Sequence, residues 1–350
     1  MRSILYYPKI NIEDNIWLRN AILYWDEVCS IVPSTDYLFH PSPEIAYLTD
    51  QDFYRPVDPL RLFQSPEAAN FEREMLARLK HLKGKLRYVD TPEEPTPRHG
   101  EKISWPRLYE SIHYNKISAL LYRYMQTHGL LHWNDDHIWL EMDKQAATLY
   151  MSVLAKYLAR IDEQAMVIGT DQKAYMNHSY APAWPNYGTW CFDLKIQECL
   201  PTPCLDVPLE DVIAFRNQRH DELLRFRGVI DEFESKLKFC ADATEIKMEA
   251  VRFQERLELA THDIERLLKE SHQNNRRTSL KTFVEGAAVT GLLTALNDPT
   301  EMNIITAAIF CLGTIILGIS KRNLGKIQND NLSAAGFSYL YYANKAGILR

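Results

Sequence analysis

Residues 1–33 read MRSILYYPKINIEDNIWLRNAILYWDEVCSIVP and predict a strand, a helix and a second strand in succession. The apolar run at residues 4–7 is followed at once by proline, which is typical of a short strand. Residues 15–29 predict a helix, because apolar side chains recur there at helical spacing. Its apolar face carries Trp17, Ala21, Tyr24 and Val28. Residues 30–32 predict the next strand, which Pro33 ends.

The same alternation continues outward as far as residue 174. Further helices are predicted at residues 66–83, 106–128 and 144–160, and further strands at residues 86–89, 138–142 and 165–169. Ser65 is suited to cap the first of these helices, Gly84 to end it and Gly129 to close the second. Strands that alternate with helices favour an α/β domain with a mainly parallel sheet. We therefore predict such a domain over residues 1–174.

A connecting loop is predicted at residues 175–206, where the composition changes. Residues 175–192 read YMNHSYAPAWPNYGTWCF and combine two prolines with many aromatic residues. Two interpretations remain open. The aromatic side chains either cover apolar surface of the α/β domain or form a recognition loop, since aromatic residues concentrate in binding hot spots. The second interpretation assigns binding to Tyr180, Trp184, Tyr187 and Trp190.

Residues 207–270 predict an all-α helical hairpin, which makes the chain helix-rich overall. Along the later helix, apolar residues recur at alternating four- and three-residue steps over three heptads. These residues are Ile246, Ala250, Phe253, Leu257, Ala260, Ile264 and Leu267. The earlier helix carries a similar stripe, with Phe215, Phe226, Ile230, Phe233 and Leu237. Such a hairpin packs within its own chain or joins two chains, so a protein partner or self-association is expected.

An apolar helical hairpin with a closing segment is predicted within residues 271–350. Its two helices read FVEGAAVTGLLTAL (283–296) and IITAAIFCLGTIILGI (304–319), and the second carries no charge. A membrane-spanning helix needs roughly 20 apolar residues, and both segments are shorter. A buried pair is the first expectation, and membrane contact through residues 283–319 is the alternative. Residues 338–345 predict a strand or a packed closing segment.

Composition limits the class of function. The chain has 350 residues, a formal net charge of -6 and 25% charged residues. An acidic balance argues against non-specific nucleic-acid binding, which needs a basic footprint. The six cysteines form no CxxC pair, and we expect neither a metal ion nor a cofactor. The amino-terminal apolar run is too short for a signal peptide, so a cytoplasmic protein is expected.

Four aspartates follow predicted strands, namely Asp36, Asp90, Asp143 and Asp171. Ligands of α/β sheets bind at the carboxyl ends of strands, and several acids there suit metal-dependent phosphoester hydrolysis. The same positions also favour helix caps, because aspartate is a preferred N-cap residue. Asp143, directly before a helix, is most simply a cap. No catalytic residue is therefore assigned outside this alternative.

Two other polar groups are candidates for binding. His128, His132 and His137 lie close together in the sequence, but their spacing fits no metal-binding pattern and indicates turn residues. The arginines of the helix near residue 220 suit an anion or belong to a solvated face; they are Arg216, Arg219 and Arg225. Arg219 and Glu222 fall on the apolar stripe of that helix, which predicts an ion pair between them.

Two stretches resemble an uncharacterised family of bacterial proteins. They are the opening, ILYYPKI with LYWDEVCSIVP, and the helix VPLEDVIAFRNQRHDELLRFR at residues 207–227. Neither stretch is a chemical motif. The resemblance implies a bacterial, cytoplasmic protein and supplies no catalytic residue.

These observations favour a non-enzymatic interaction or sensor-effector protein. In this hypothesis the α/β domain and the aromatic loop receive a partner or signal, and the helical part assembles or acts. Antiviral defence is the expected setting, by analogy with the architectures of bacterial conflict systems. The alternatives are a membrane-perturbing effector that uses residues 283–319 and a metal-dependent phosphoester hydrolase that uses the strand-end aspartates.

Overall fold

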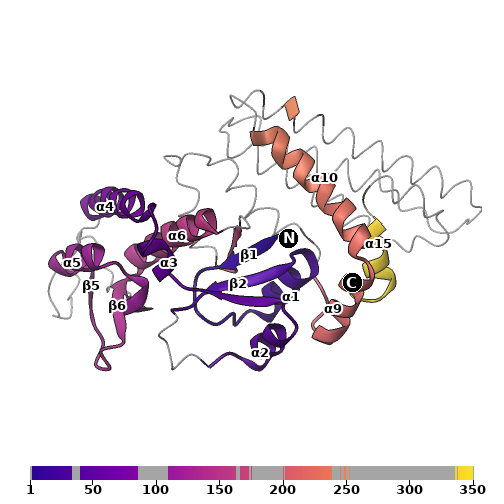
Figure 1. Cartoon of the computed structure of the whole chain (residues 1–350), viewed down its shortest axis with the longest axis horizontal. Coiled ribbons are helices and arrows are strands. Elements are labelled where there is room, and N and C mark those ends of the chain that lie inside the picture. The colour runs from indigo at the N-terminus through magenta and orange to yellow at the C-terminus, as the bar shows by residue number, and fades with distance from the viewer. Residues whose placement is uncertain are drawn as a thin grey trace, which may run out of the picture.

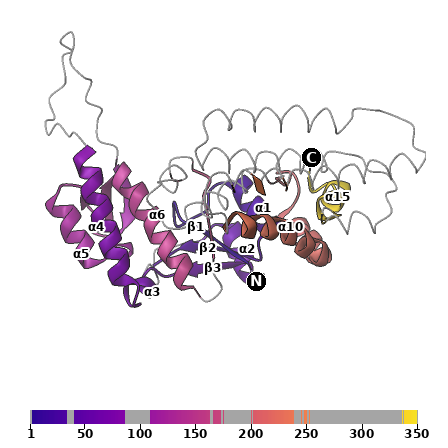
Figure 2. The same cartoon turned by 90° about the horizontal axis from the view of Figure 1, so that it is seen from above.

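The computed structural model describes residues 2–33, 40–85, 109–162, 166–172, 175, 200, 202–238 and 338–349, with isolated positions at 245, 248, 249, 252 and 336. A parallel sheet lies in the middle, an antiparallel sheet with helices lies at one end, and the last described helices lie at the other (Figure 1). Figure 2 shows the same row of parts from above. The predicted α/β fold, rich in helix, is confirmed. Of the all-α hairpin predicted at residues 207–270, the later helix lies almost wholly outside the described residues.

The parallel sheet consists of four short strands in the order β3-β2-β1-β7. Their bounds are β1 Ser3–Tyr6, β2 Glu27–Ile31, β3 Tyr54–Val57 and β7 Val167–Gly169. In the middle strand, Leu5 pairs with Cys29 on one side and with Ile168 on the other. All three side chains are fully buried. Parallel strands need cover on both faces, and here both faces are covered.

Each face of this sheet has its own hydrophobic core. Residues 4–7, in and just after β1, alternate between the two: Ile4 and Tyr6 belong to the first core, and Leu5 and Tyr7 belong to the second. Helices α1 (Asn15–Tyr24) and α2 (Pro43–Asp50) contribute to the first core. The second core joins the parallel sheet to α6 (Lys144–Ile161) and to the antiparallel sheet.

Helix α6 is the centre of the second core, because almost every side chain from Ala146 to Ala159 is buried. It is surrounded by α3 (Leu60–Phe63), α4 (Ala68–Lys85) and α5 (Ala119–Thr127). On α4, Phe71, Met75 and Leu79 are fully buried against it. This helix continues through Gly84 rather than ending there.

The long helix that the sequence predicts at residues 106–128 is wrong in its first part, because residues 109–113 form a strand of a small antiparallel sheet and the helix α5 begins only at Ala119. The sheet has the order β4-β6-β5, with β4 Tyr109–His113, β5 Leu131–Trp133 and β6 Trp139–Asp143. A short 3-10 turn, Tyr114–Lys116, leads from β4 to α5. The partner strand β6 lies some thirty residues further along the chain, as the pairing of Ile112 with Leu140 illustrates. The spacing of apolar residues within a short window gives no information about a strand partner so far along the chain.

The first predicted helix is also too long. Helix α1 ends at Tyr24, and the backbone of Trp25 is already extended. Glu27, Val28 and Cys29 instead begin β2, in register with β1. The predicted strands near residues 4–7, 138–142 and 165–169 are confirmed as β1, β6 and β7 within one or two residues.

The last described helices cover the first core. They are α9 Leu209–Gln218, α10 His220–Lys238 and α15 Ser338–Lys345. The phenol of Tyr339 donates a hydrogen bond of 2.8 Å to the carbonyl oxygen of Leu23, and its ring stacks on Phe226. The predicted closing segment at residues 338–345 is therefore packed, and it is a helix.

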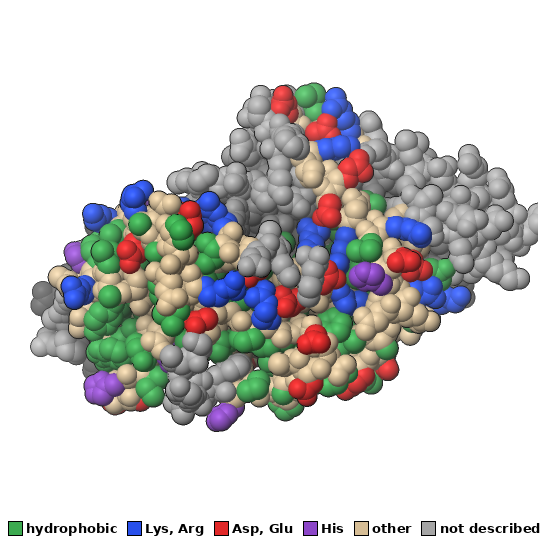
Figure 3. Space-filling model, in the orientation of Figure 1, with side chains coloured by type: hydrophobic (Ala, Val, Ile, Leu, Met, Phe, Trp, Pro, Cys, Tyr) green, Lys and Arg blue, Asp and Glu red, His purple; other side chains and the backbone are tan. Residues whose placement is uncertain are grey.

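Hydrophobic side chains are also exposed at the far end of the molecule, over β5, β6 and α5 (Figure 3). Tyr114, Leu120 and Trp133 are between 37% and 47% exposed there. The ring of Trp133 lies 5.9 Å from the rings of both Tyr114 and Tyr122. Contiguous exposed aromatic surface of this kind is typical of interaction sites.

Candidate functional site

The carboxyl ends of β1 and β7 form the topological switch point of the parallel sheet. The chain leaves β1 through α1 toward β2, whereas β7 lies on the opposite side of β1. Ligands of α/β sheets bind at the carboxyl ends of strands where the strand order reverses. We refer to residues 7–14 and 170–172 at this edge as the switch-point edge.

Tyr6 and Asp171 meet at the switch-point edge. The Tyr6 hydroxyl donates a hydrogen bond of 3.0 Å to Oδ1 of Asp171. Burial raises the pKa of Asp171, and the hydrogen bond from Tyr6 opposes this only in part. Burial and the nearby carboxylate also raise the pKa of Tyr6. The edge thus holds a carboxyl group that keeps its proton more readily than a free aspartate does.

The first turn of α1 packs directly against this pair. Asp14 caps the helix, since its Oδ1 accepts hydrogen bonds from the backbone N–H groups of Ile16 and Trp17 at 2.8 and 2.9 Å. The Trp17 ring lies 4.9 Å from the Tyr6 ring. A Cβ atom on Gly169 would lie 2.7 Å from both Ile4 and Trp17. Only glycine lets β7 end so close to α1.

The loop between β1 and α1 adds an unpaired acceptor. Oδ1 of Asn11 is buried and has no hydrogen-bond partner among the described residues. The cation in this loop is engaged, because Lys9 pairs with Glu13 at 2.6 Å. Unpaired buried acceptors are uncommon in folded proteins, so we expect a ligand to donate a hydrogen bond to this oxygen. The edge is suited to a small ligand that brings hydroxyl or amino groups.

The other end of α1 is held by the C-terminal helices. The carbonyl oxygen of Tyr24 accepts a hydrogen bond of 2.7 Å from Nε of Arg227. The Tyr24 ring lies 5.9 Å from Phe226 and 6.2 Å from Tyr339. One helix therefore contacts the switch-point edge with its first turn and α10 and α15 with its last.

Asp26, just beyond α1, is held by two buried arginines. Its Oδ1 accepts hydrogen bonds from Arg216 at 2.5 Å and from Arg227 at 2.9 Å. Burial by itself raises the pKa of Asp26, but the charge of Arg227 and hydrogen bonds from Arg2 and Arg227 outweigh it, so the pKa lies below its ordinary value. The Arg216 guanidinium also lies over the Phe53 ring at 4.8 Å. In the structure Arg216 thus serves to bind Asp26.

The other two candidate arginines lie nearer the surface. Arg219 donates to Glu222 at 3.1 Å and stacks on the Tyr342 ring at 3.9 Å. The ion pair between Arg219 and Glu222 is therefore present, but with side chains 31% and 18% exposed it is only partly buried. Arg225 is exposed on α10. Anion binding by these arginines stays a prediction.

The strand-end aspartates do not come together within the described residues. Oδ1 of Asp143 accepts hydrogen bonds from the backbone N–H groups of Gln145 and Ala146, which confirms it as the cap of α6. Asp171 lies at the switch-point edge, and Asp36 and Asp90 lie outside the described residues. No three His, Cys, Asp or Glu side chains gather to hold a metal ion in the described part of the chain, His128, His132 and His137 included.

Several predicted features fall outside the described ranges. They are the apolar hairpin at residues 283–319 and the aromatic candidates Tyr180, Trp184, Tyr187 and Trp190. Of the helices within the described ranges, none is both long and apolar enough to cross a membrane.

The sequence signal found Asp171 but missed its neighbours. An acid after an apolar run indicates the end of a strand. The roles of Tyr6, Asn11 and Gly169 can be recognised only once β1 and β7 are known to pair. That pairing joins residues more than 160 positions apart, as Tyr6 with Gly169. Within the loop, the run Lys9 to Asp14 before a helix was the local signal available.

A family described as a family of unknown function (DUF6236) matches residues 109–346, more than half of the chain. The chain belongs to this family. The DUF6236 match begins with β4 and extends past α15, so it includes the helix at residues 207–227 but not the opening segment. The predicted resemblance to an uncharacterised family without a known activity is confirmed. No curated protein and no solved structure matches the chain.

Proposed function

We propose that the protein is a non-enzymatic sensor-effector that binds a small polar ligand at the switch-point edge and responds through its C-terminal helices. One observation carries this proposal: α1 contacts the edge with its first turn and α10 and α15 with its last. A helix is stiff along its axis, and packed interiors transmit displacements rather than absorb them.

The packing around Trp17 supports this coupling. A ligand that moves Tyr6 or Asp171 acts on Trp17, because the tryptophan lies between the Tyr6 ring and Gly169 without spare room. The motion of α1 then reaches the carbonyl groups of Leu23 and Tyr24, to which Tyr339 and Arg227 are bonded. The output is a change in how the C-terminal helices meet a protein partner or a second copy.

The chemistry of the edge supports a ligand that is rich in donors. Asn11 offers an unpaired acceptor, and Asp171 offers a carboxyl group with a raised pKa. A small number of polar groups that fix the orientation of a ligand is typical of small-molecule sites.

The test is to look for the ligand and then remove its site. The small-molecule fraction of a cell extract is added to purified protein, the melting temperature is recorded, and bound molecules are identified by mass spectrometry after denaturation. We expect wild type to gain several degrees and the variant Asn11→Leu with Asp171→Asn to gain none. Arg123→Glu, an exposed change on α5, is the matched control and keeps the shift. An equal shift in all three proteins, or none in any, contradicts the proposal.

Coupling is tested separately by hydrogen exchange with the identified ligand. Amides of α10 and α15 should change their exchange rates when the ligand binds, although neither helix contributes to the edge. Antiviral defence is the cellular setting that we propose, by architectural analogy. In that setting, cells that carry the Asn11→Leu, Asp171→Asn variant should lose protection in a phage plaque assay, and cells with Arg123→Glu should keep it.

A further inference from the structure

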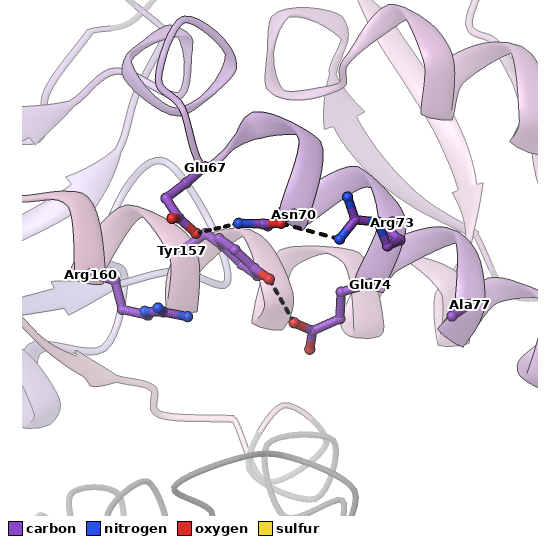
Figure 4. A pocket seen from close by; sticks show the side chains of 7 residues that line it. All are labelled: Glu67, Asn70, Arg73, Glu74, Ala77, Tyr157 and Arg160. Carbon is purple, nitrogen blue, oxygen red and sulfur yellow. Dashed lines mark hydrogen bonds between the residues drawn. The ribbon is translucent and has the colours of Figure 1, made fainter.

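An open groove of about 490 Å³ runs between α4 and α6, away from the switch-point edge. Four of its lining residues come from α4, between Asn70 and Ala77, Glu67 lies just before that helix, and two come from α6, Tyr157 and Arg160. Figure 4 shows the Tyr157 side chain in the middle of the groove, with Arg160 and Arg73 to either side in this view.

At the floor of the groove, several side chains donate hydrogen bonds to Glu74. Its carboxylate accepts hydrogen bonds from Lys156 at 3.1 Å, from the Tyr157 hydroxyl at 2.8 Å and from Arg78 at 3.0 Å. Burial alone raises the pKa of Glu74, but the bond from Tyr157 and the charge of Lys156 outweigh it and leave the pKa below its ordinary value. Glu74 is therefore charged and already shared by two cations.

The two arginines on the sides of the groove have no acidic partner among the described residues. Arg73 donates only to the side-chain oxygen of Asn70, at 3.3 Å, and Arg160 lies 5.6 Å from the centre of the Tyr157 ring. Both side chains are exposed. Glu67, the other acid that lines the groove, accepts a hydrogen bond from Asn70.

The charged residues that line the groove differ in how they are engaged. Glu67 accepts a hydrogen bond from Asn70 and Glu74 is paired with Arg78 and Lys156, whereas the guanidinium groups of Arg73 and Arg160 have no acidic partner among the described residues. Unpaired guanidinium groups next to an aromatic ring are typical recognition elements for carboxylates. We propose that the groove between α4 and α6 is a docking site for an acidic segment of a partner protein.

The shape of the groove favours a peptide segment over a small molecule. From Glu67 to Ala77 the helix rises about 15 Å, which corresponds to four or five residues of extended chain. Small-molecule sites enclose most of their ligand, whereas this groove is open along its length. Nucleic acid is disfavoured, because the acidic remainder of the surface repels a long polyanion. This docking site does not depend on the proposed ligand at the switch-point edge.

The test measures binding of a fluorescein-labelled peptide of ten glutamates to the full chain by fluorescence anisotropy. We expect saturable binding that weakens as salt rises, and a dissociation constant at least tenfold larger for Arg73→Glu with Arg160→Glu. The milder pair Arg73→Gln with Arg160→Gln should weaken binding by a smaller factor. Arg123→Glu adds the same charge per site on α5 and should stay within twofold of wild type. Thermal melts confirm that each variant is folded.

Three results would overturn the proposal. The first is an absence of peptide binding to wild type. The second is equal weakening by the groove variants and by Arg123→Glu, which would indicate a general charge effect. The third is tighter binding of a ten-residue thymidine oligonucleotide than of the peptide, lost in the same variants, which would assign the groove to nucleic acid. The Asn11→Leu, Asp171→Asn variant should bind the peptide with the affinity of wild type. A failure of the proposed ligand site at the switch-point edge is therefore distinguished from a failure of the groove proposal.

Discussion

Gly169 determines how closely β7 approaches α1, and a single methyl group tests this. A Cβ atom at this position would lie 2.7 Å from Ile4 and Trp17. We expect Gly169→Ala to lower the free energy of unfolding by about 1–3 kcal/mol, since overpacking of a filled interior costs that much. Urea unfolding checks the value. Gly228→Ala is the control: nothing lies within 4 Å of its Cβ in helix α10, so the gain in helix propensity should stabilise by about 1 kcal/mol.

The contribution of Asp171 to stability depends on pH with the opposite sign to that of most carboxylates. Its folded-state pKa is raised above the ordinary 3.8, mainly by burial. The folded protein therefore binds more protons than the unfolded chain in that window, and its stability falls as pH rises through the folded pKa. We expect Asp171→Asn to be at least as stable as wild type at pH 7 and to lose this relative advantage below pH 3.8. A loss of more than about 1 kcal/mol at pH 7 would show that the carboxylate is needed for folding.

The roles of single residues are predicted correctly where the neighbouring sequence determines them. Asp143 before a helix was predicted as a cap, and its carboxylate does accept two backbone N–H bonds. Tyr6 and Asn11 carried no such signal, because their roles depend on a strand and a loop brought together by the sheet. The candidate site was therefore predicted only through Asp171.

At the scale of elements, α9 and α10 each bind Asp26, just before β2, through one arginine. Both Arg216 and Arg227 are buried, so each needs the carboxylate as counter-charge. Removal of one partner of a buried ion pair costs about 3–5 kcal/mol. We expect Asp26→Asn to destabilise by about that amount in thermal or urea unfolding.

A double-mutant cycle distinguishes the interaction between Asp26 and Arg216 from the other effects of each substitution. Arg216→Met in the Asp26→Asn background should cost less than Arg216→Met alone, because the arginine then no longer has a charged partner. Strictly additive effects would mean that Arg216 and Asp26 do not interact.

Element types were predicted well where packing agrees with local periodicity, as in α4 and α6. The prediction failed at residues 106–128, where Ile112 pairs with Leu140 and the chain forms a strand, a turn and a short helix. Strand pairing over such a separation is a tertiary effect that overrides local propensity. The end of α1 was missed for the same reason, since the register with β1 decides where β2 begins.

For the whole molecule, loss of stability in acid follows from three carboxylates. In Asp26, Glu27 and Glu74, burial raises the pKa, but cationic partners and hydrogen bonds outweigh it and lower the pKa below the ordinary 3.8 or 4.5. The unfolded chain then binds more protons in that window, so stability is present above about pH 4.5 and is lost as pH falls through the folded-state values. Urea unfolding between pH 3 and pH 7 measures this loss. Glu74→Gln should show a shallower decline, and an unchanged slope would contradict the assignment.

The first core closes only when α15 is in place. Tyr339 and Leu340 are fully buried, and the backbone of Ile348 bonds to Cys204. We expect removal of residues 336–350 to expose the last turn of α1 and to give a protein that binds a hydrophobic dye and melts at a lower temperature. Tyr339→Phe, which keeps the ring and removes only the hydroxyl, is the milder control and should cost about 1 kcal/mol.

The placement of α15 against α1 also has a consequence for synthesis. Leu23 and Tyr339 are joined by a hydrogen bond across 316 positions, so that many further residues must be synthesised before Tyr339 can cover the last turn of α1. At roughly 5–20 residues per second, the exposed apolar face is available to chaperones for some tens of seconds while the ribosome moves on. A chain whose synthesis stops before Tyr339 would therefore keep the last turn of α1 without this cover.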